Sequence, residues 1–189
     1  MGRQAQRETT RRHLFDVALS LFRAQGFAET RVDEIIETAG VAKGTFYVHF
    51  PSKDAVLAAY ADEITRDLMP QLPSWLTRPP RDAIAAVFEA LNVYVKRDRR
   101  FIGDVIRVEL MGDPWEDGKP SALTQILSPI LAQGQMQGLV RSDLPVAVVA
   151  QHLLSNYLIG LAWIVRHEWP LEETMAQVFV LTVDGIWAP

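Results

Sequence analysis

The chain has 189 residues, 49% of them hydrophobic and 22% charged, so it is a folded protein with one globular unit or two small ones. It contains no cysteine, which excludes disulfides, thiolate metal sites and cysteine nucleophiles. The net charge of −4 argues against a protein coated in nucleic acid unless the charge is segregated along the chain.

Charge is in fact unevenly distributed. The N-terminus is locally basic, with Arg3, Arg7, Arg11 and Arg12 against Glu8, and many of the acidic residues lie later in the chain. A basic end and an acidic body suit a protein that touches DNA with one end only.

The sequence offers little sign of a membrane or export segment. No apolar run reaches the length needed to span a bilayer, and the opening residues MGRQAQRETTRR lack the apolar core of a signal peptide. We therefore expect a cytoplasmic protein with no membrane partner.

The first predicted elements are a flexible arm over residues 1–7 and a helix that begins at Thr9 or Thr10 and ends at Gln25. Apolar residues three and four apart give this helix one apolar face, and Gly26 has the place of a C-cap. Thr30 is then expected to cap the next helix.

The stretch TRVDEIIETAGVAKGTFYVHFPSK, residues 30–53, has the layout of a helix-turn-helix. One short helix covers Val32 to Thr38, and a second covers Ala42 to Phe50. Ala39-Gly40-Val41 forms the turn between them, where Gly40 permits a left-handed backbone. The second helix would present its N-terminal residues to the major groove.

The residue types around this second helix suit DNA contact. Lys43 supplies a cation for phosphate or guanine, Thr45 can bond to a base edge, and Gly44 leaves no side chain where a backbone must approach. Ser52 is expected to cap the helix that begins at Lys53, whose N–H groups and ammonium would form an anion site. The full set of candidate DNA contacts is Thr30, Arg31, Lys43, Gly44, Thr45, Tyr47, Val48, His49 and Lys53.

The run GTFYVHFPSKDAVL, with Gly26-Phe27, Ile35-Ile36 and Ala39-Gly40-Val41, resembles the DNA-binding domain of the TetR family of bacterial transcriptional regulators. The close resemblance covers about the first quarter of the chain. Val48 departs from it, since many members carry an aromatic or polar residue there, and it would touch a thymine methyl instead. The resemblance implies a helix-turn-helix domain over residues 1–52 and an effector-binding and dimerisation domain over residues 53–189.

The remaining chain is expected to be helical, so the fold class is all-α. A helix runs from Lys53 towards Leu68, and the proline-rich stretch 69–80 is expected to be a connector. Further helices are predicted over residues 81–97, 101–111, 121–137 (capped by Ser121 and kinked or split at Pro129), 145–167 (capped by Asp143) and 171–186.

The last two of these helices are apolar on more than one face. A pair of this kind needs two surfaces to pack against, namely the core of its own chain and, most simply, a second copy. The TetR-like pattern implies the same contact, so we expect a homodimer through these helices.

The resemblance also implies an effector pocket in the C-terminal body. Aromatic or polar residues on otherwise apolar helices are the candidates for its lining: Phe88, Asn92, Arg107, Glu109, Met111, Trp115, Gln125, His152, Asn156 and Trp163. Each could equally be a core aromatic or a hydrogen-bonded polar group. Aromatic and aliphatic residues dominate, which favours a small, largely apolar or aromatic ligand.

Neither catalysis nor a cofactor is expected. The chain has no GxSxG, HExxH or glycine-rich phosphate loop, and its four histidines do not pair at metal-ligand spacing. The expected function is therefore a regulator, most simply a repressor. As a homodimer it would bind a pseudo-palindromic DNA operator, at the nucleoid, and a small-molecule effector would release it. The alternatives are an activator of the same family, a ligand-binding or enzyme-like protein with a vestigial helix-turn-helix, and a protein-interaction module.

Overall fold

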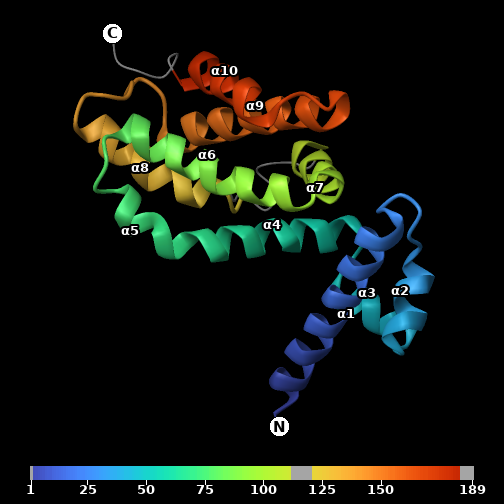
Figure 1. Cartoon of the computed structure of the whole chain (residues 1–189). Coiled ribbons are helices and arrows are strands. Elements are labelled where there is room, and N and C mark those ends of the chain that lie inside the picture. The colour runs from blue at the N-terminus through green and yellow to red at the C-terminus, as the bar shows by residue number, and fades with distance from the viewer. Residues whose placement is uncertain (1, 112–120, 184–189) are drawn as a thin grey trace. The chain divides into compact units, whose positions relative to one another are not determined.

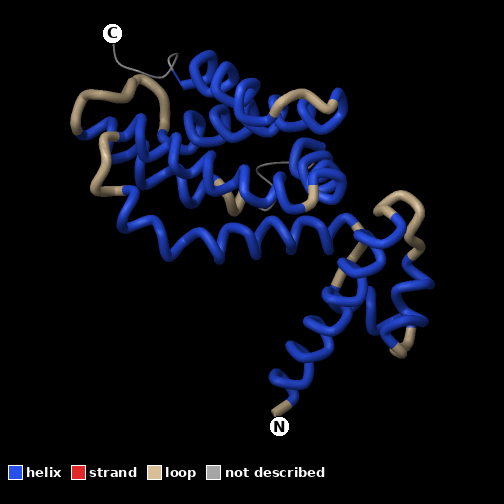
Figure 2. Tube along the Cα trace, viewed as in Figure 1, coloured by secondary structure: helices blue, strands red, loops and turns tan. Residues whose placement is uncertain are grey.

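The computed structural model describes residues 2–111 and 121–183, whose regular elements are helices, as expected for an all-α chain (Figures 1 and 2). The chain packs as two compact units, Met1–Tyr60 and Ala61–Pro189. The division falls inside one helix, α4 (Asp54–Leu68), so a single helix supplies residues to both units.

The first unit contains α1 (Arg3–Gln25), α2 (Val32–Ala39) and α3 (Lys43–His49). Aromatic rings fill its core, with Phe46 of α3 fully buried and within ring-contact distance of Phe50, which in turn stacks on Phe15 of α1. Gly40 ends α2 with φ 65°, the left-handed backbone that the turn was expected to need. The helix-turn-helix is thus held together by α1.

Two predictions about the start of this unit are wrong. Residues 3–7 are helical rather than a flexible arm, because α1 begins at Arg3. Thr30 does not cap α2, since the N-cap is Arg31. The buried Thr30 hydroxyl instead donates a 2.7 Å hydrogen bond to the carbonyl of Gly26, which closes the loop between α1 and α2.

The connection to the second unit follows the prediction at its start and departs from it further on. The Ala55 N–H donates a hydrogen bond to Ser52 Oγ at the beginning of α4, as a cap would. The proline-rich stretch is not an extended connector, because it forms the helices η1 (Met69–Gln71) and α5 (Leu72–Trp75) within the second unit.

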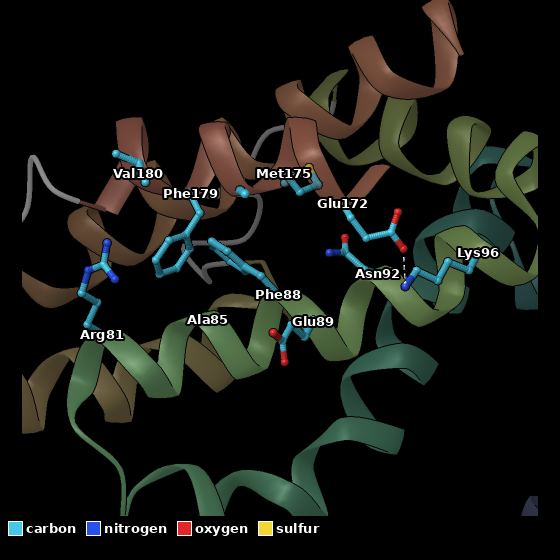
Figure 3. Close-up of a pocket in the computed structure, with 11 residues that line it drawn as sticks. Arg81, Ala85, Phe88, Glu89, Asn92, Lys96, Glu172, Met175, Phe179 and Val180 are labelled. Atoms are coloured by element: carbon cyan, nitrogen blue, oxygen red, sulfur yellow. Dashed lines mark ion pairs between the residues drawn. The ribbon is translucent and has the colours of Figure 1, made fainter. Parts of the chain in front are cut away.

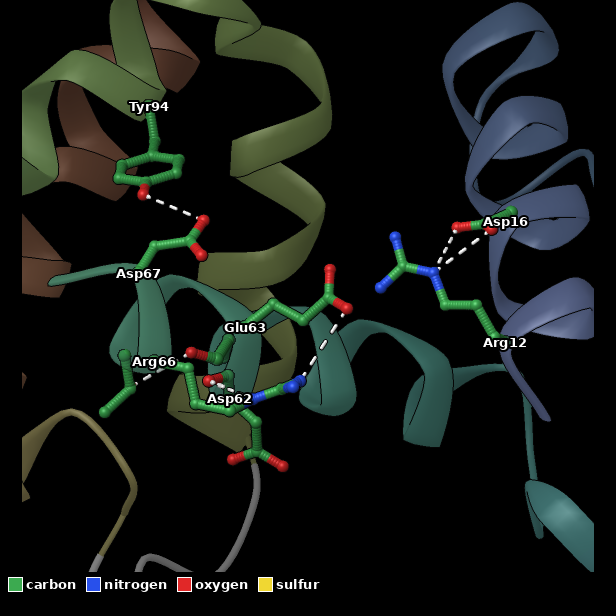
Figure 4. Close-up of polar contacts among 9 residues, drawn as sticks. Arg12, Asp16, Asp62, Glu63, Arg66, Asp67 and Tyr94 are labelled. Carbon is green, nitrogen blue, oxygen red and sulfur yellow. Dashed lines mark hydrogen bonds and ion pairs between the residues drawn. The ribbon is translucent and has the colours of Figure 1, made fainter. Parts of the chain in front are cut away.

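The second unit is completed by α6 (Pro80–Arg97), α7 (Arg99–Met111), α8 (Thr124–Met136), α9 (Val146–His167) and α10 (Leu171–Val183). The long helix α9 packs against α7, α8 and α10 (Figure 1). Tyr157 of α9 is buried and stacks on Phe88 of α6, and its hydroxyl donates a hydrogen bond to Asn92 Oδ1 at 2.7 Å, with the Phe88 carbonyl oxygen 3.2 Å away as a second acceptor. Elsewhere on α6, the Tyr94 hydroxyl donates a hydrogen bond to Asp67 of α4 (Figure 4).

Two further cap predictions in this unit are wrong, and at Pro129 one of the two predicted alternatives is excluded. Ser121 does not cap α8, because its hydroxyl donates to Glu109. Asp143 does not cap α9, whose N-cap is Pro145, and it forms an ion pair with Arg141 instead. Pro129 lies inside α8 without splitting it into two helices. In the first two cases the side chain has a partner outside its own helix start.

The expectation that no apolar run is long enough for a bilayer also needs correction. By length and composition α9 could span a membrane, since it has 22 residues and an 18-residue window of mean hydropathy 1.5. Half of that window is buried inside the protein, which is typical of the core helix of a soluble protein.

Candidate nucleic-acid interface

Helix α3 has an inner and an outer face. Phe46 is fully buried against the core, whereas Tyr47 and Val48 expose 47% and 64% of their surface. Lys43 and Gly44 are also exposed, and Thr45 and His49 are half-buried. The exposed side chains of α3 are those predicted to reach DNA, and the fold leaves them free to do so.

Lys43 is positioned by an ion pair with α2. Its Nζ lies 2.8 Å from Asp33 Oδ1, and both side chains are largely exposed. The hydrogen bond and the charge attraction raise the pKa of Lys43 and lower that of Asp33, so both groups are charged at neutral pH. The ammonium is thus held at the start of α3, from where it can exchange Asp33 for a phosphate or a guanine edge.

Gly44 has no packing reason to be glycine. A Cβ built at Gly44 would meet no atom within 4 Å, and its φ is not positive. By contrast, Gly40 in the turn needs its positive φ. The packing of the first unit would therefore accept a side chain at Gly44.

His49 and Arg31 lie at the ends of the two helices. Arg31 is exposed at the start of α2, where it can reach a phosphate. Burial and, after it, the positive charges of Arg7 and Arg11 lower the pKa of the His49 imidazole below its ordinary 6.5. His49 is therefore largely neutral at pH 7 in the free protein, and would donate one N–H to a phosphate oxygen.

The structure places two of the nine predicted DNA contacts inside the fold. Thr30 is buried, as described above. The Lys53 ammonium donates hydrogen bonds to the carbonyls of Phe27, Ala28 and Thr30 at 2.8, 3.3 and 3.1 Å, and it lies over the Phe27 ring. The Lys53 ammonium thus binds the carbonyl groups of the loop between α1 and α2.

A contact that the sequence does not predict supports the turn. His13 Nε2 lies 3.1 Å from the carbonyl oxygen of Ala39, 26 residues away along the chain. This contact connects α1 to the end of α2. Nothing local in the sequence indicates it, because it depends on how α1 crosses the helix-turn-helix.

Three of the ten candidate ligand residues line one of two hollows among the described residues. Phe88 and Asn92 line a groove of about 590 Å³ between α6 and α10 (Figure 3). Glu109 lines a separate cavity of about 40 Å³ inside the second unit. Trp115 lies outside the described residues, and the other six lie away from both hollows: Arg107, Met111, Gln125, His152, Asn156 and Trp163.

The groove combines an apolar floor with charged ends. Phe88 and Phe179 meet edge to face at 6.1 Å, beside Met175. The guanidinium of Arg81 lies 5.1 Å from the centre of the Phe179 ring at one end, and an ion pair between Lys96 and Glu172 joins α6 to α10 at the other (Figure 3). Sequence analysis missed the α10 side of this groove, because apolar residues such as Met175 and Phe179 resemble ordinary core positions.

The small cavity is lined mainly by apolar residues, together with Tyr94, Tyr157 and the carboxyl group of Glu109. Burial raises the pKa of Glu109, although a 3.1 Å hydrogen bond donated by Ser121 opposes this shift. No group of His, Cys, Asp or Glu suited to a metal ion occurs within residues 2–111 and 121–183. The cavity is about the size of a single water molecule.

Comparison with known proteins agrees with this geometry. Residues 14–60 match the model of the family described as "Bacterial regulatory proteins, tetR family". The chain is 29% identical to the transcriptional repressor DhaR of Mycobacterium sp. (strain GP1), over 92% of both chains. It is 38% identical over 92 residues to the uncharacterized HTH-type regulator TtgW of Pseudomonas putida, covering 47% of this chain and 67% of that protein.

A solved structure extends the likeness to the C-terminal helices. The TetR-family repressor FadR of Thermus thermophilus, in complex with lauroyl-CoA, superposes with a TM-score of 0.78 at 26% identity, over 93% of this chain and 94% of that chain. Both the helix-turn-helix and the helical body are therefore shared with known regulators. The chain belongs to the TetR family of bacterial transcriptional regulators.

Proposed function

We propose that this regulator is a repressor that binds a pseudo-palindromic operator as a homodimer and is released by a small, largely apolar effector. Residues 1–52 would supply DNA binding, and residues 53–189 the effector site and the dimer contact. The observation that carries the proposal is the outer face of α3, where Lys43, Gly44, Tyr47 and Val48 are exposed. Similarity to DhaR, which is named a repressor, supports the direction of regulation.

DNA contact would divide between base edges and phosphates. Lys43 and Thr45 lie in the first turn of α3, the part of a recognition helix that reaches base edges. Tyr47, His49 and Arg31 would donate hydrogen bonds to phosphates, and Val48 would pack on a thymine methyl. Thr30 and Lys53 would act indirectly, by holding the loop that orients α2.

The dimer would form on the exposed apolar faces of α9 and α10. Val148, Ile159 and Trp163 are exposed along α9 at spacings of eleven and four residues, which places them on one side of the helix. Leu181 of α10 is 83% exposed. An apolar surface of this kind is costly in water, and a second copy would cover it through a two-fold contact.

The effector would bind in the groove between α6 and α10. Its volume suits a drug-sized molecule, whereas the 40 Å³ cavity does not. The apolar body of the ligand would rest on Phe88, Met175 and Phe179, and the Asn92 side chain and the charged ends would hold its polar groups. Lauroyl-CoA is the first compound to test, because the similar FadR of Thermus thermophilus was solved in complex with it.

Effector binding in the second unit would be coupled to DNA binding by the first through α4, the helix that supplies residues to both units. A ligand that favours one arrangement of the second unit would shift the population of dimers whose two α3 helices match successive major grooves. Release of the protein from its operator then requires only that the ligand binds the DNA-incompetent arrangement of the dimer more tightly than the DNA-competent one.

The test is a gel shift with the purified protein and the DNA flanking its own gene. We expect a shift that specific DNA competes and bulk DNA does not, and that is lost in Tyr47→Ala while the dimer persists in size-exclusion chromatography. Ala176→Trp would fill the groove from its exposed edge and abolish release by ligand without loss of DNA binding. A wild-type protein that binds no flanking fragment at low salt would refute the proposed function.

A further inference from the structure

Helix α1 is longer than the core of its unit requires. It begins at Arg3, yet its first buried residue is Leu14. The three turns before Leu14 therefore add no buried side chain to the helix-turn-helix. Residues 3–9 are all exposed, so this helical stretch of about 10 Å needs a reason outside the packing of the unit.

The extension carries a row of arginines. Arg3, Arg7 and Arg11 are spaced four residues apart, so they lie along one side of α1 at intervals of about 6 Å. Within the part of the chain that the structure describes, Arg3 and Arg7 have no hydrogen-bond or ion-pair partner. Their charges are thus available to a ligand.

This row adjoins the recognition helix. The guanidinium of Arg11 lies 4.8 Å from the centre of the ring of Phe50, the residue directly after α3. The charges of Arg7 and Arg11 also act on His49, the last residue of α3. The inner end of the arginine row therefore lies next to the C-terminal end of α3.

The row is unfavourable for the free protein. Like charges four residues apart on a helix repel one another, and α1 has no acidic residue in its first turn to balance the positive end of the helix dipole. Its N-cap, Gly2, also makes no side-chain hydrogen bond. Glu8 is the only acidic residue among residues 1–15, so the stretch itself offers little negative charge. A polyanion bound along this side would offset the repulsion between the arginines and would be attracted to the positive end of the helix dipole.

We propose that Arg3, Arg7 and Arg11 form a second DNA-binding element, which contacts backbone phosphates beside the bases that α3 approaches. This inference rests on the proposed function, since it extends the same DNA-bound state. The row supplies affinity that depends on salt but not on sequence, whereas α3 selects the operator.

The salt dependence of binding tests this division. Each phosphate neutralised contributes about 0.9 to the slope of log K against log salt, so the six arginines of a dimer contribute about 5. Arg3→Gln/Arg7→Gln/Arg11→Gln should lower the slope by that amount. The ratio of the wild-type DNA-binding constant to that of the triple variant should then fall about 10³-fold between 50 and 200 mM salt. The triple substitution should lower the affinity for operator DNA and for scrambled DNA by the same factor.

Two matched control variants distinguish the loss of the arginine charges from a change in the structure of α1. Arg3→Lys/Arg7→Lys/Arg11→Lys keeps the charge and should keep the slope. Arg12→Gln removes a neighbouring arginine that is paired with Asp16 on its own helix (Figure 4), and it should leave the slope near the wild-type value. Circular dichroism reports whether the glutamine variant keeps the helix.

The outcomes are distinct. A wild-type slope in the triple glutamine variant, with Tyr47→Ala still abolishing binding, overturns the arginine row and leaves the proposed function standing. A loss confined to operator DNA also overturns it, because the row would then read sequence. A wild-type protein that binds no DNA overturns both proposals.

Discussion

Lys53 offers a sharp test of the structure, because sequence and structure assign it different roles. Its ammonium donates to three carbonyls of the loop between α1 and α2, at 2.8–3.3 Å. Hydrogen bonds from a charged group contribute about 1.5–3 kcal/mol each when buried. The carbonyls near Ala28 are partly accessible and would regain water, so Lys53→Met should lower the free energy of unfolding of the first unit by about 2 kcal/mol in total.

Hydrogen exchange measured by mass spectrometry is the suitable assay, since the tryptophans all lie in the second unit and do not report on the first. A loss of about 2 kcal/mol should speed exchange about 30-fold for amides of α1–α3 that exchange through opening of the whole unit. Lys43→Met is the matched control. It removes an exposed lysine paired with exposed Asp33, so exchange should stay unchanged while operator affinity falls.

The reverse pattern would refute this reasoning. If Lys53→Met keeps wild-type exchange rates but loses operator affinity with a smaller salt slope, then its ammonium binds a phosphate and the carbonyl contacts carry little stability. The expectation from sequence alone would then be correct at this position.

Three further predictions concern the second unit, and all three use urea unfolding followed by tryptophan fluorescence. Tyr157→Phe removes the hydrogen bond that a buried hydroxyl donates to α6, and should cost about 1–2 kcal/mol; an unchanged midpoint would contradict that bond. Gly160→Ala places a Cβ 2.8 Å from Val178 and should cost about 1–3 kcal/mol, whereas full stability would mean that α9 and α10 can separate freely. Burial raises the folded-state pKa of Glu109, so the unfolded chain releases this proton first, and stability should fall as pH rises above its ordinary value of 4.5. Glu109→Gln should flatten that part of the pH profile, and a profile identical to the wild type would contradict the shift.

Local features of the fold followed directly from the sequence. The spacing of apolar residues predicted the helices, because an α-helix repeats every 3.6 residues whatever it packs against. Gly40 and Ser52 were correctly assigned because a turn and a cap are settled within four residues of chain. The family resemblance likewise came from one continuous stretch around α3.

Cap predictions failed where a side chain found a partner other than the start of its own helix. Ser121 and Asp143 can cap helices by type, yet their oxygens bind Glu109 and Arg141. The start of α1 was missed for a different reason. Its first three turns bury nothing, so they carry no apolar period that a sequence reading could detect.

By itself the sequence determined the all-α class, the helix-turn-helix and the family, since each rests on periodicity or on one unbroken motif. Only the tertiary structure decided which side chains face outward. It buried Thr30, placed the Lys53 ammonium on a loop, and joined Phe88 to Phe179 across a groove. The reason is physical: exposure and pairing depend on residues tens of positions apart, which meet only when the helices pack.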